Sequence, residues 1–166
     1  MKRKILSRAE MKAVARRLRA AGKVIVFTNG CFDLLHLGHA RYLRKARALG
    51  DALVVGLNSD ASVRRLKGEG RPLVRGADRA EMLAALEAVD YVAFFGEDTP
   101  ARLVAEILPD IIVKGGDYRP GEVAGGRTVE AAGGRIVIVP LVRGRSTTGL
   151  IAKAAGVSPG KGRSRR

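Results

Sequence analysis

The stretch KVIVFTNGCFDLLHLGHA, residues 23–40, decides the fold of this chain. Its first part, 23–28, is short, apolar and rich in β-branched residues, which indicates a strand buried on both faces. Asn29 and Gly30 then signal a tight turn. A helical pattern follows from Ala40 to Leu49 and ends at a glycine. The stretch therefore predicts a strand, a turn and a helix in immediate succession.

The same alternation continues on both sides of this unit. Further strands are expected at 52–57, 91–95, 111–114 and 135–139. Ser7 and Glu10 form a capping-box pattern ahead of a helical stretch at 11–21. Further helices are expected at 60–66, 79–89 and 123–132, from Pro100 and after Ser146. Strands that alternate with helices imply crossover connections, so the predicted fold class is α/β. We expect a Rossmann-like, five-stranded parallel sheet with helices on both faces, in which ligands bind beyond the carboxyl ends of the strands.

Length and charge placement predict one domain. The 166 residues fit a single domain over 1–157, which opens with an N-terminal helix within 1–22 and is followed by a basic tail, 158–166, that we expect to be disordered. The formal charge is +15, but residues 1–23 and 158–166 supply +12 of it. Neither basic end contains an aromatic side chain, unlike a surface that binds RNA. A specific nucleic-acid partner is therefore not expected.

The cysteine content and the hydropathy pattern predict a cytoplasmic protein. Cys31 is the single cysteine, so neither an intramolecular disulfide nor a CxxC metal or redox motif can form. No apolar run approaches the roughly 18 to 20 residues that cross a bilayer. The charged start, 1–8, is not followed by the apolar stretch of a secretory signal. We expect no contact with a membrane.

Both histidines of the chain, His36 and His39, follow the first predicted strand. Because they lie three residues apart at the start of a helix, their side chains face the same way. At a helix start the dipole and the free N–H groups attract anions. Gly38, between them, leaves room for a phosphate or a base. The pattern indicates a phosphate site. Two alternatives stay open: histidines in an ordinary turn, and a metal site with Asp33, for which no fourth ligand is evident.

Residues 30–39, GCFDLLHLGH, resemble the GxFDxxHxGH signature of the cytidylyltransferase-like nucleotidyltransferases. Residues 144–148, GRSTT, are similar to the second signature of that superfamily, a Ser-Thr-Thr cluster that opens the final helix. The resemblance covers about residues 5–153. Further segments resemble the ADP-heptose synthase branch of the superfamily in particular: 58–63, 67–68, 78–79, 98–100 and 114–118.

The resemblance implies a reaction and a set of site residues. The reaction is adenylyl transfer from ATP, accompanied by Mg²⁺, to D-glycero-β-D-manno-heptose 1-phosphate, with release of pyrophosphate, for bacterial surface polysaccharide synthesis; a homodimer is also implied. The implied catalytic residues are His36, His39, Lys67 and Arg79. The residues implied to bind nucleotide or phosphate are Thr28, Asn29, Gly30, Cys31, Phe32, Gly38, Lys114, Gly115, Ser146, Thr147 and Thr148. Those implied to bind the substrate are Asp33, Asn58, Asp60 and Asp117. No dedicated metal ligands are expected.

Simpler roles remain open for several of these residues. Ser146 fits a helix cap, and Asp33 fits a brace for the first loop through bonds to backbone N–H groups. Segment 58–60 fits a cap for the next helix, Asp117 a turn, and Lys67 a solvated charge. Two other functions also stay open. One is a cytidylyltransferase that acts on glycerol 3-phosphate or another alcohol phosphate, and the other is a basic RNA-binding module with an inactive nucleotide fold.

Overall fold

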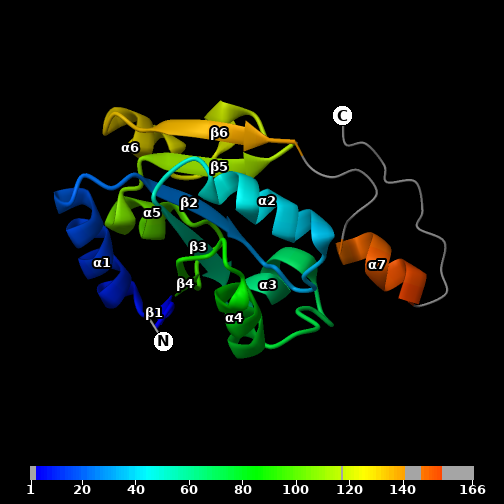
Figure 1. The fold of residues 1–166 in the computed structure, drawn as a ribbon. Coiled ribbons are helices and arrows are strands. Elements are labelled where there is room, and N and C mark those ends of the chain that lie inside the picture. Colours follow the sequence, from blue (N-terminus) through cyan, green and yellow to red (C-terminus); the bar gives the residue numbers. More distant parts are fainter. Residues whose placement is uncertain (1–2, 117, 141–146, 155–166) are drawn as a thin grey trace.

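A computed structural model describes residues 3–116, 118–140 and 147–154. Its centre is a parallel sheet of six strands in the order β1-β4-β3-β2-β5-β6 (Figure 1). The strands are β1 Ile5–Leu6, β2 Ile25–Gly30, β3 Ala52–Asn58, β4 Tyr91–Phe95, β5 Ile111–Gly115 and β6 Arg135–Val139. The Rossmann-like class is confirmed, whereas the predicted count of five is one short. The additional strand, β1, has only two residues and is held at the sheet edge by β4, so no local pattern marks it.

Helices cover both faces of this sheet (Figure 1). They are α1 Arg8–Ala20, α2 Leu37–Arg47, α3 Asp60–Lys67, α4 Gly76–Ala85, α5 Ala101–Ile107, α6 Gly126–Ala131 and α7 Thr147–Ala154, with a short 3₁₀ turn η1 at Pro120–Glu122. One core cluster joins α1, α5 and α6 to the sheet, and a second joins α2 and α4 to the opposite face. Successive strand residues alternate between the clusters: Phe27 belongs to the first and Val26 to the second.

Several helix boundaries differ from the predicted ones. Helix α1 begins as expected after Ser7, whose side chain forms a capping box with Glu10. Helix α4 spans 76–85 rather than 79–89, because Leu86 is extended and the chain turns there to enter β4. Helix α6 starts at Gly126, after a left-handed Gly125 that a helix beginning at 123 could not contain. The predicted tail, 158–166, lies outside the described residues. No helix in the described parts of the chain has the length and apolar character to span a bilayer.

The strand order reverses next to β2, where β3 and β4 extend to one side and β5 and β6 to the other. Strand β2 pairs with β3 over six residues, from Ile25 to Gly30. It pairs with β5 at only two positions, Val26 with Ile111 and Phe27 with Ile112. Beyond them the backbone ladder between β2 and β5 ends. In parallel α/β sheets such a reversal opens a crevice at the carboxyl ends of the strands, where ligands bind.

Gly56 of β3 lies against β2 just below this crevice, and its substitution tests the packing there. A Cβ atom at position 56 would lie 2.7 Å from the ring of Phe27, which is fully buried, and 3.2 Å from the Cβ of Asn29. We expect Gly56→Ala to lower the free energy of unfolding by about 1–3 kcal/mol through overpacking. Urea unfolding measures this change. In the control Gly121→Ala, the added Cβ meets no atom within 4 Å, and we expect a change within about 0.5 kcal/mol. Equal losses in the two variants would contradict the packing argument.

Candidate active site

A cavity of about 520 Å³ lies at the carboxyl ends of β2, β3 and β5. Helix α7 lies beyond this end of the sheet (Figure 1) and contributes Thr147 to the cavity wall. Ten of the predicted site residues line the cavity: Asn29, Gly30, Cys31, Phe32, Asp33, His39, Asn58, Lys67, Lys114 and Thr147. The structure therefore brings most of the predicted site together from five separate segments.

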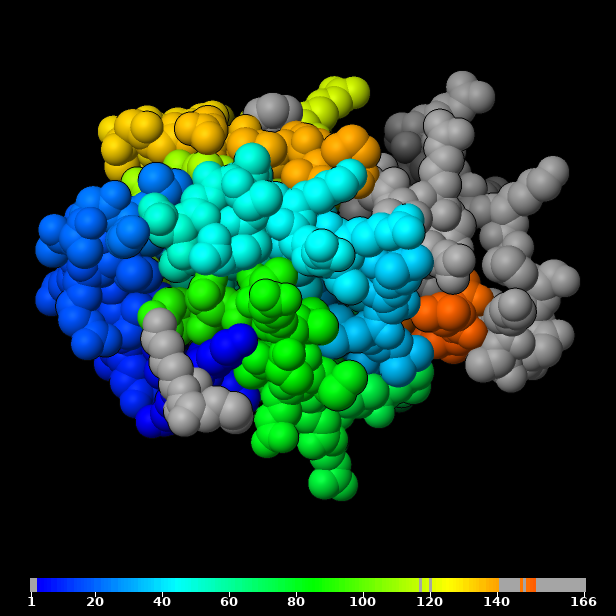
Figure 2. Space-filling view, in the orientation of Figure 1, coloured from blue at the N-terminus to red at the C-terminus, as the bar shows by residue number. Residues whose placement is uncertain are grey.

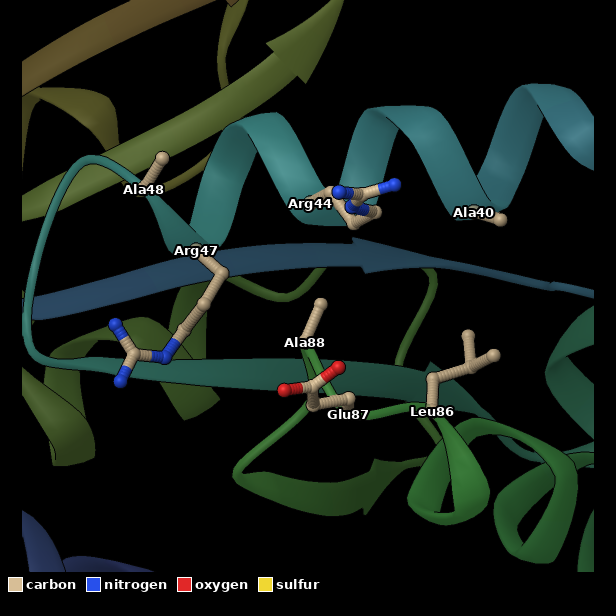
Figure 3. Close-up of a pocket in the computed structure, with 7 residues that line it drawn as sticks. All are labelled: Ala40, Arg44, Arg47, Ala48, Leu86, Glu87 and Ala88. Atoms are coloured by element: carbon tan, nitrogen blue, oxygen red, sulfur yellow. The ribbon is translucent and has the colours of Figure 1, made fainter.

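A second hollow, of about 420 Å³, lies between α2 and segment 86–88 (Figure 3). Figure 2 shows the outer surfaces of α2, in cyan, and of the green segment below it on one face of the molecule. None of the predicted site residues lines this hollow. The guanidinium of Arg47, which does line it, already forms an ion pair with Asp90 at 2.7 Å. We therefore take the cavity at the strand ends as the candidate site.

The two histidines lie together where β2 leads into α2. His36 is extended and precedes the helix, and His39 lies in its first turn. Their rings stack with centroids 3.9 Å apart and planes inclined by 20°. The predicted common orientation is thus confirmed. The first N–H groups of α2 have no partner within the helix, so imidazoles and backbone donors lie at one helix end, an arrangement that suits an anion.

Burial keeps the His39 imidazole neutral. Loss of hydration lowers the pKa of His39 to about 4, and repulsion from His36 adds to this effect against a smaller opposing contribution from the Leu34 backbone. A neutral imidazole still has one N–H to donate to a phosphate oxygen. Because negative charge nearby favours the protonated form, a bound polyphosphate would raise this pKa. His39 can therefore follow charge as it develops on a phosphate.

Lys114 provides a cation on the other side of the strand reversal. It lies on β5, is 7% exposed, and donates a hydrogen bond from Nζ to Oδ1 of Asn29 on β2. Its Nζ also lies 5.0 Å from the centre of the Tyr118 ring. Burial lowers the pKa of Lys114 to about 8, so the ammonium is still mostly charged at neutral pH. With Gly115 after it, Lys114 suits the predicted phosphate contact.

Arg79 lies beneath the cavity and has contacts that differ from the predicted ones. Its side chain is 1% exposed. The guanidinium donates to the backbone carbonyls of Cys31, Asn58 and Val74 and to the carboxylate of Asp60, the last at 2.6 Å. These bonds use four of the five N–H groups of the guanidinium. The contact of Arg79 with substrate phosphates stays a prediction, and in this structure the side chain joins the loops at Cys31 and Val74 to the end of β3.

The carboxylate and amide groups predicted to bind substrate are also bonded within the protein. Asp33 pairs with Arg71 at 2.6 Å and accepts from the N–H groups of Leu73 and Val74. Burial opposes the ionised form, but these bonds outweigh it and hold the pKa of Asp33 below its ordinary value. Asp33 thus holds the loop that follows α3. This resembles the simpler role given above, a brace that bonds to backbone N–H groups, although the loop is a different one.

The other two described members of that set have structural partners too. Asn58 donates to Ser62 Oγ at 2.9 Å. Asp60 accepts from Arg79 and from the N–H of Gly76. Asp33, Asn58 and Asp60 thus have partners within the protein, and their contact with substrate stays a prediction. The fourth member, Asp117, lies outside the described residues.

Thr28, one of the residues predicted to bind the nucleotide, also has a partner within the protein. Its side chain is fully buried, and Oγ1 lies 2.7 Å from the hydroxyl of Tyr42. Its hydroxyl therefore has a structural partner, and its contact with a nucleotide stays a prediction. Lys67, at the end of α3, is in contrast exposed, and it lines the cavity. Gly38 lies in the first turn of α2, between the histidines.

The second predicted signature is only partly described. Thr147 opens α7 and donates from Oγ1 to the carbonyl of Leu34 at 3.4 Å. This long bond connects α7 to the loop that carries His36. Ser146 and the side chain of Thr148 lie outside what the structure describes.

Other cavity residues carried no predicted role. They are Leu66, Arg71, Asp98, Thr99, Pro100, Tyr118, Glu122 and Ala124. Four of them lie in segments 98–100 and 114–118, which resemble segments of the ADP-heptose synthase branch, so that resemblance was the signal that could have found them. Within the described ranges, no group of three or more His, Cys, Asp or Glu residues is arranged to hold a metal ion.

A Rossmann-like sheet with a His-x-Gly-His helix start at its strand reversal defines a nucleotidyltransferase-type α/β domain. The cytidylyltransferase-like family model matches residues 27–132, and the chain belongs to this family.

Individual relatives agree with this assignment. The bifunctional protein HldE of Geobacter metallireducens is 62% identical over 135 residues, which are 81% of this chain and 28% of that protein. HldE of Syntrophotalea carbinolica is 57% identical over 148 residues, 89% of this chain and 30% of that protein. The chain thus spans less than a third of the length of these relatives. The crystal structure of the lipopolysaccharide core biosynthesis protein from Thermoplasma volcanium is 32% identical with a TM-score of 0.60, and the match covers 73% of this chain and 98% of that one.

The low pKa of His39 can be tested by NMR titration and by the pH dependence of the free energy of unfolding. We expect the imidazole of His39 to titrate near pH 4 in NMR spectra of the folded protein. Because the ordinary histidine pKa is near 6.5, the unfolded chain binds this proton more readily, and the free energy of unfolding should fall as pH falls from about 6.5 to 4. The contribution is fully present above that window. Urea unfolding across this range should show a shallower pH slope for His39→Asn than for the wild type. Equal slopes, or titration near 6.5, would contradict the burial argument.

Proposed function

We propose that this chain transfers the adenylyl group of ATP to D-glycero-β-D-manno-heptose 1-phosphate, giving ADP-heptose and pyrophosphate. The observation that carries the proposal is the stacked His36–His39 pair at the start of α2. His39 lines the same cavity as Lys67 and Lys114. The segments that resemble the ADP-heptose synthase branch support the sugar acceptor. So does the similarity to the HldE proteins and to a protein named for lipopolysaccharide core biosynthesis.

The proposed reaction needs positioning and charge stabilisation but no covalent enzyme intermediate. An oxygen of the acceptor phosphate attacks the α-phosphorus of ATP in line, and the bond from that phosphorus to the bridging oxygen breaks. The electron pair of the broken bond leaves with pyrophosphate. Donors and cations aimed at the developing charge lower the barrier. His36 and His39 would donate to the triphosphate, while Lys67 and Lys114 would neutralise phosphate oxygens.

Lys67 and Lys114 differ in exposure, which suits them to meet phosphates in different ways. Lys67 is exposed at the end of α3 and can approach substrates as they bind. Lys114 is buried and bonded to Asn29, so its place is fixed before they arrive. Arg71 lines the same cavity, although its Nε is already paired with Asp33. A cavity of about 520 Å³ is within the usual range of small-molecule sites.

The cofactor, assembly and location are proposed from general chemistry and from the family resemblance. Mg²⁺ would enter with ATP, because this ion keeps several waters and is usually held by substrate phosphates with few protein ligands. A homodimer is proposed from the family resemblance alone. A cytoplasmic location fits an ATP-dependent reaction and a chain with one cysteine.

A cytidylyltransferase acting on an alcohol phosphate is the second candidate, since the family model that matches is described as cytidylyltransferase-like. An assay of pyrophosphate release separates the two. ATP, CTP, GTP and UTP are each combined with heptose 1-phosphate or glycerol 3-phosphate. We expect the highest kcat/KM for ATP with heptose 1-phosphate. Turnover confined to CTP and glycerol 3-phosphate would replace the heptose proposal, and no turnover with any pair would favour a binding module.

Removal of one imidazole tests the catalytic pair. We expect His39→Ala to lower kcat by about 10²-fold, the loss typical of removing one donor to developing charge. The circular dichroism spectrum should stay that of the wild type. Lys45→Ala is the control, because Lys45 lies on the same helix but is exposed and outside the cavity. A wild-type kcat in His39→Ala would remove His39 from the catalytic set.

A further inference from the structure

The carboxyl ends of β2 and β5 are joined by side chains where their backbone ladder ends. The last backbone pair is Phe27 with Ile112. At the next position along each strand, Thr28 and Val113 both bond to a third residue, Tyr42. One position further, Asn29 and Lys114 bond directly to each other. Two successive side-chain links therefore continue the junction toward the cavity.

Tyr42 belongs to α2 and reaches both strands with one hydroxyl. It donates to the carbonyl of Val113 at 2.9 Å and lies 2.7 Å from Oγ1 of Thr28. A hydroxyl has one proton, so Thr28 must be the donor in the second bond. Burial raises the pKa of Tyr42 to about 12. The phenol therefore stays protonated at working pH, and the link to Val113 does not depend on titration.

The position of Tyr42 connects this junction to the phosphate site. Tyr42 comes three residues after His39 on α2, so the two side chains lie on the same side of the helix. Its partners, Thr28 and Val113, directly precede Asn29 and Lys114. One hydroxyl thus ties the helix that carries His39 to both strands that carry the Lys114–Asn29 contact.

We propose that Tyr42 is a positioning residue for the proposed adenylyl transfer. Its hydroxyl holds α2, β2 and β5 in one arrangement, which fixes the separation between the histidine pair and Lys114. Tyr42 is absent from the residues that line the cavity, so it acts through these groups and not on the substrate. The inference rests on the proposed function, because the distance it fixes matters only if both groups act on one ligand.

Loss of the Tyr42 hydroxyl would change the relative positions of the groups around the site more than the affinity for ATP. Tyr42→Phe keeps the ring but leaves the Val113 carbonyl and Thr28 without this partner in a buried place, which favours a local shift of the strands. A displacement of about 1 Å at a catalytic site can cost up to 10²-fold in rate. We therefore expect kcat to fall by about tenfold or more, with little change in the KM for ATP.

The test compares Tyr42→Phe with Thr28→Val, the double variant and a control. Thr28→Val removes the other hydroxyl, and the double variant should lose no more kcat than the more affected single variant, because both changes break one network. Tyr91→Phe is the control. Tyr91 is also buried, but it starts β4 at the opposite end of the sheet. We expect Tyr91→Phe to keep the kcat of the wild type.

NMR supplies a readout that is independent of turnover. The chain has only two histidines, so each imidazole signal can be followed without overlap from others. Inorganic tripolyphosphate serves as the probe. We expect Tyr42→Phe, but not Tyr91→Phe, to shift the imidazole signals of the free protein and to change their response to tripolyphosphate.

The outcomes separate the two proposals. Shifted imidazole signals together with a lower kcat support the positioning role. Unchanged signals and kcat in Tyr42→Phe overturn it, as does a loss of kcat that only follows the unfolded fraction. If the wild type turns over no substrate pair, the proposed function fails. The imidazole signals then still decide whether Tyr42 positions the histidines, with unmoved signals again overturning that role.

Discussion

The end of the backbone ladder between β2 and β5 is the constraint on which the rest of the site depends. Strand order reverses there, and the two strands share only two paired positions. Polar backbone groups near the reversal still need partners, because an unsatisfied buried carbonyl costs free energy. Tyr42 satisfies Val113, and Lys114 joins Asn29 one position further on. Asn29 and Lys114 line the cavity, so this second link forms part of its wall, whereas Tyr42 lies behind it.

Two buried ionic groups then fix the loops around this crevice. Burying a charge is costly unless it is paired and hydrogen-bonded. Arg79 meets that requirement with acceptors from the loops after β2 and β3 and from Val74. Asp33 meets it from the other side through Arg71 and two N–H groups. Arg79, predicted to be catalytic, and Asp33, predicted to bind substrate, therefore have structural partners in the loops, and Lys67 and Lys114 are the cations that we propose for phosphate.

Local patterns account for what the sequence predicts well. The histidine pair depends on a spacing of three residues at a helix start, and the capping box at Ser7 is equally local. Long-range partners account for the rest. A sequence does not show whether a charged side chain points into a cavity or into a loop 40 residues away, as Asp33 does toward Leu73. Strand β1 escapes prediction for the same reason, because two residues form a strand only when β4 supplies the partner.

Burial also determines which ligand the cavity favours. Loss of hydration lowers the pKa values of both His39 and Lys114, to about 4 and about 8. Burial thus disfavours the charged forms of both side chains, and a bound anion would favour those charged forms again. A neutral ligand offers no such compensation, whereas a triphosphate offers several negative charges at once. Most of the formal charge of +15 lies in the terminal segments, so the preference for polyphosphate that we propose would come from a few partly buried groups and not from the net charge.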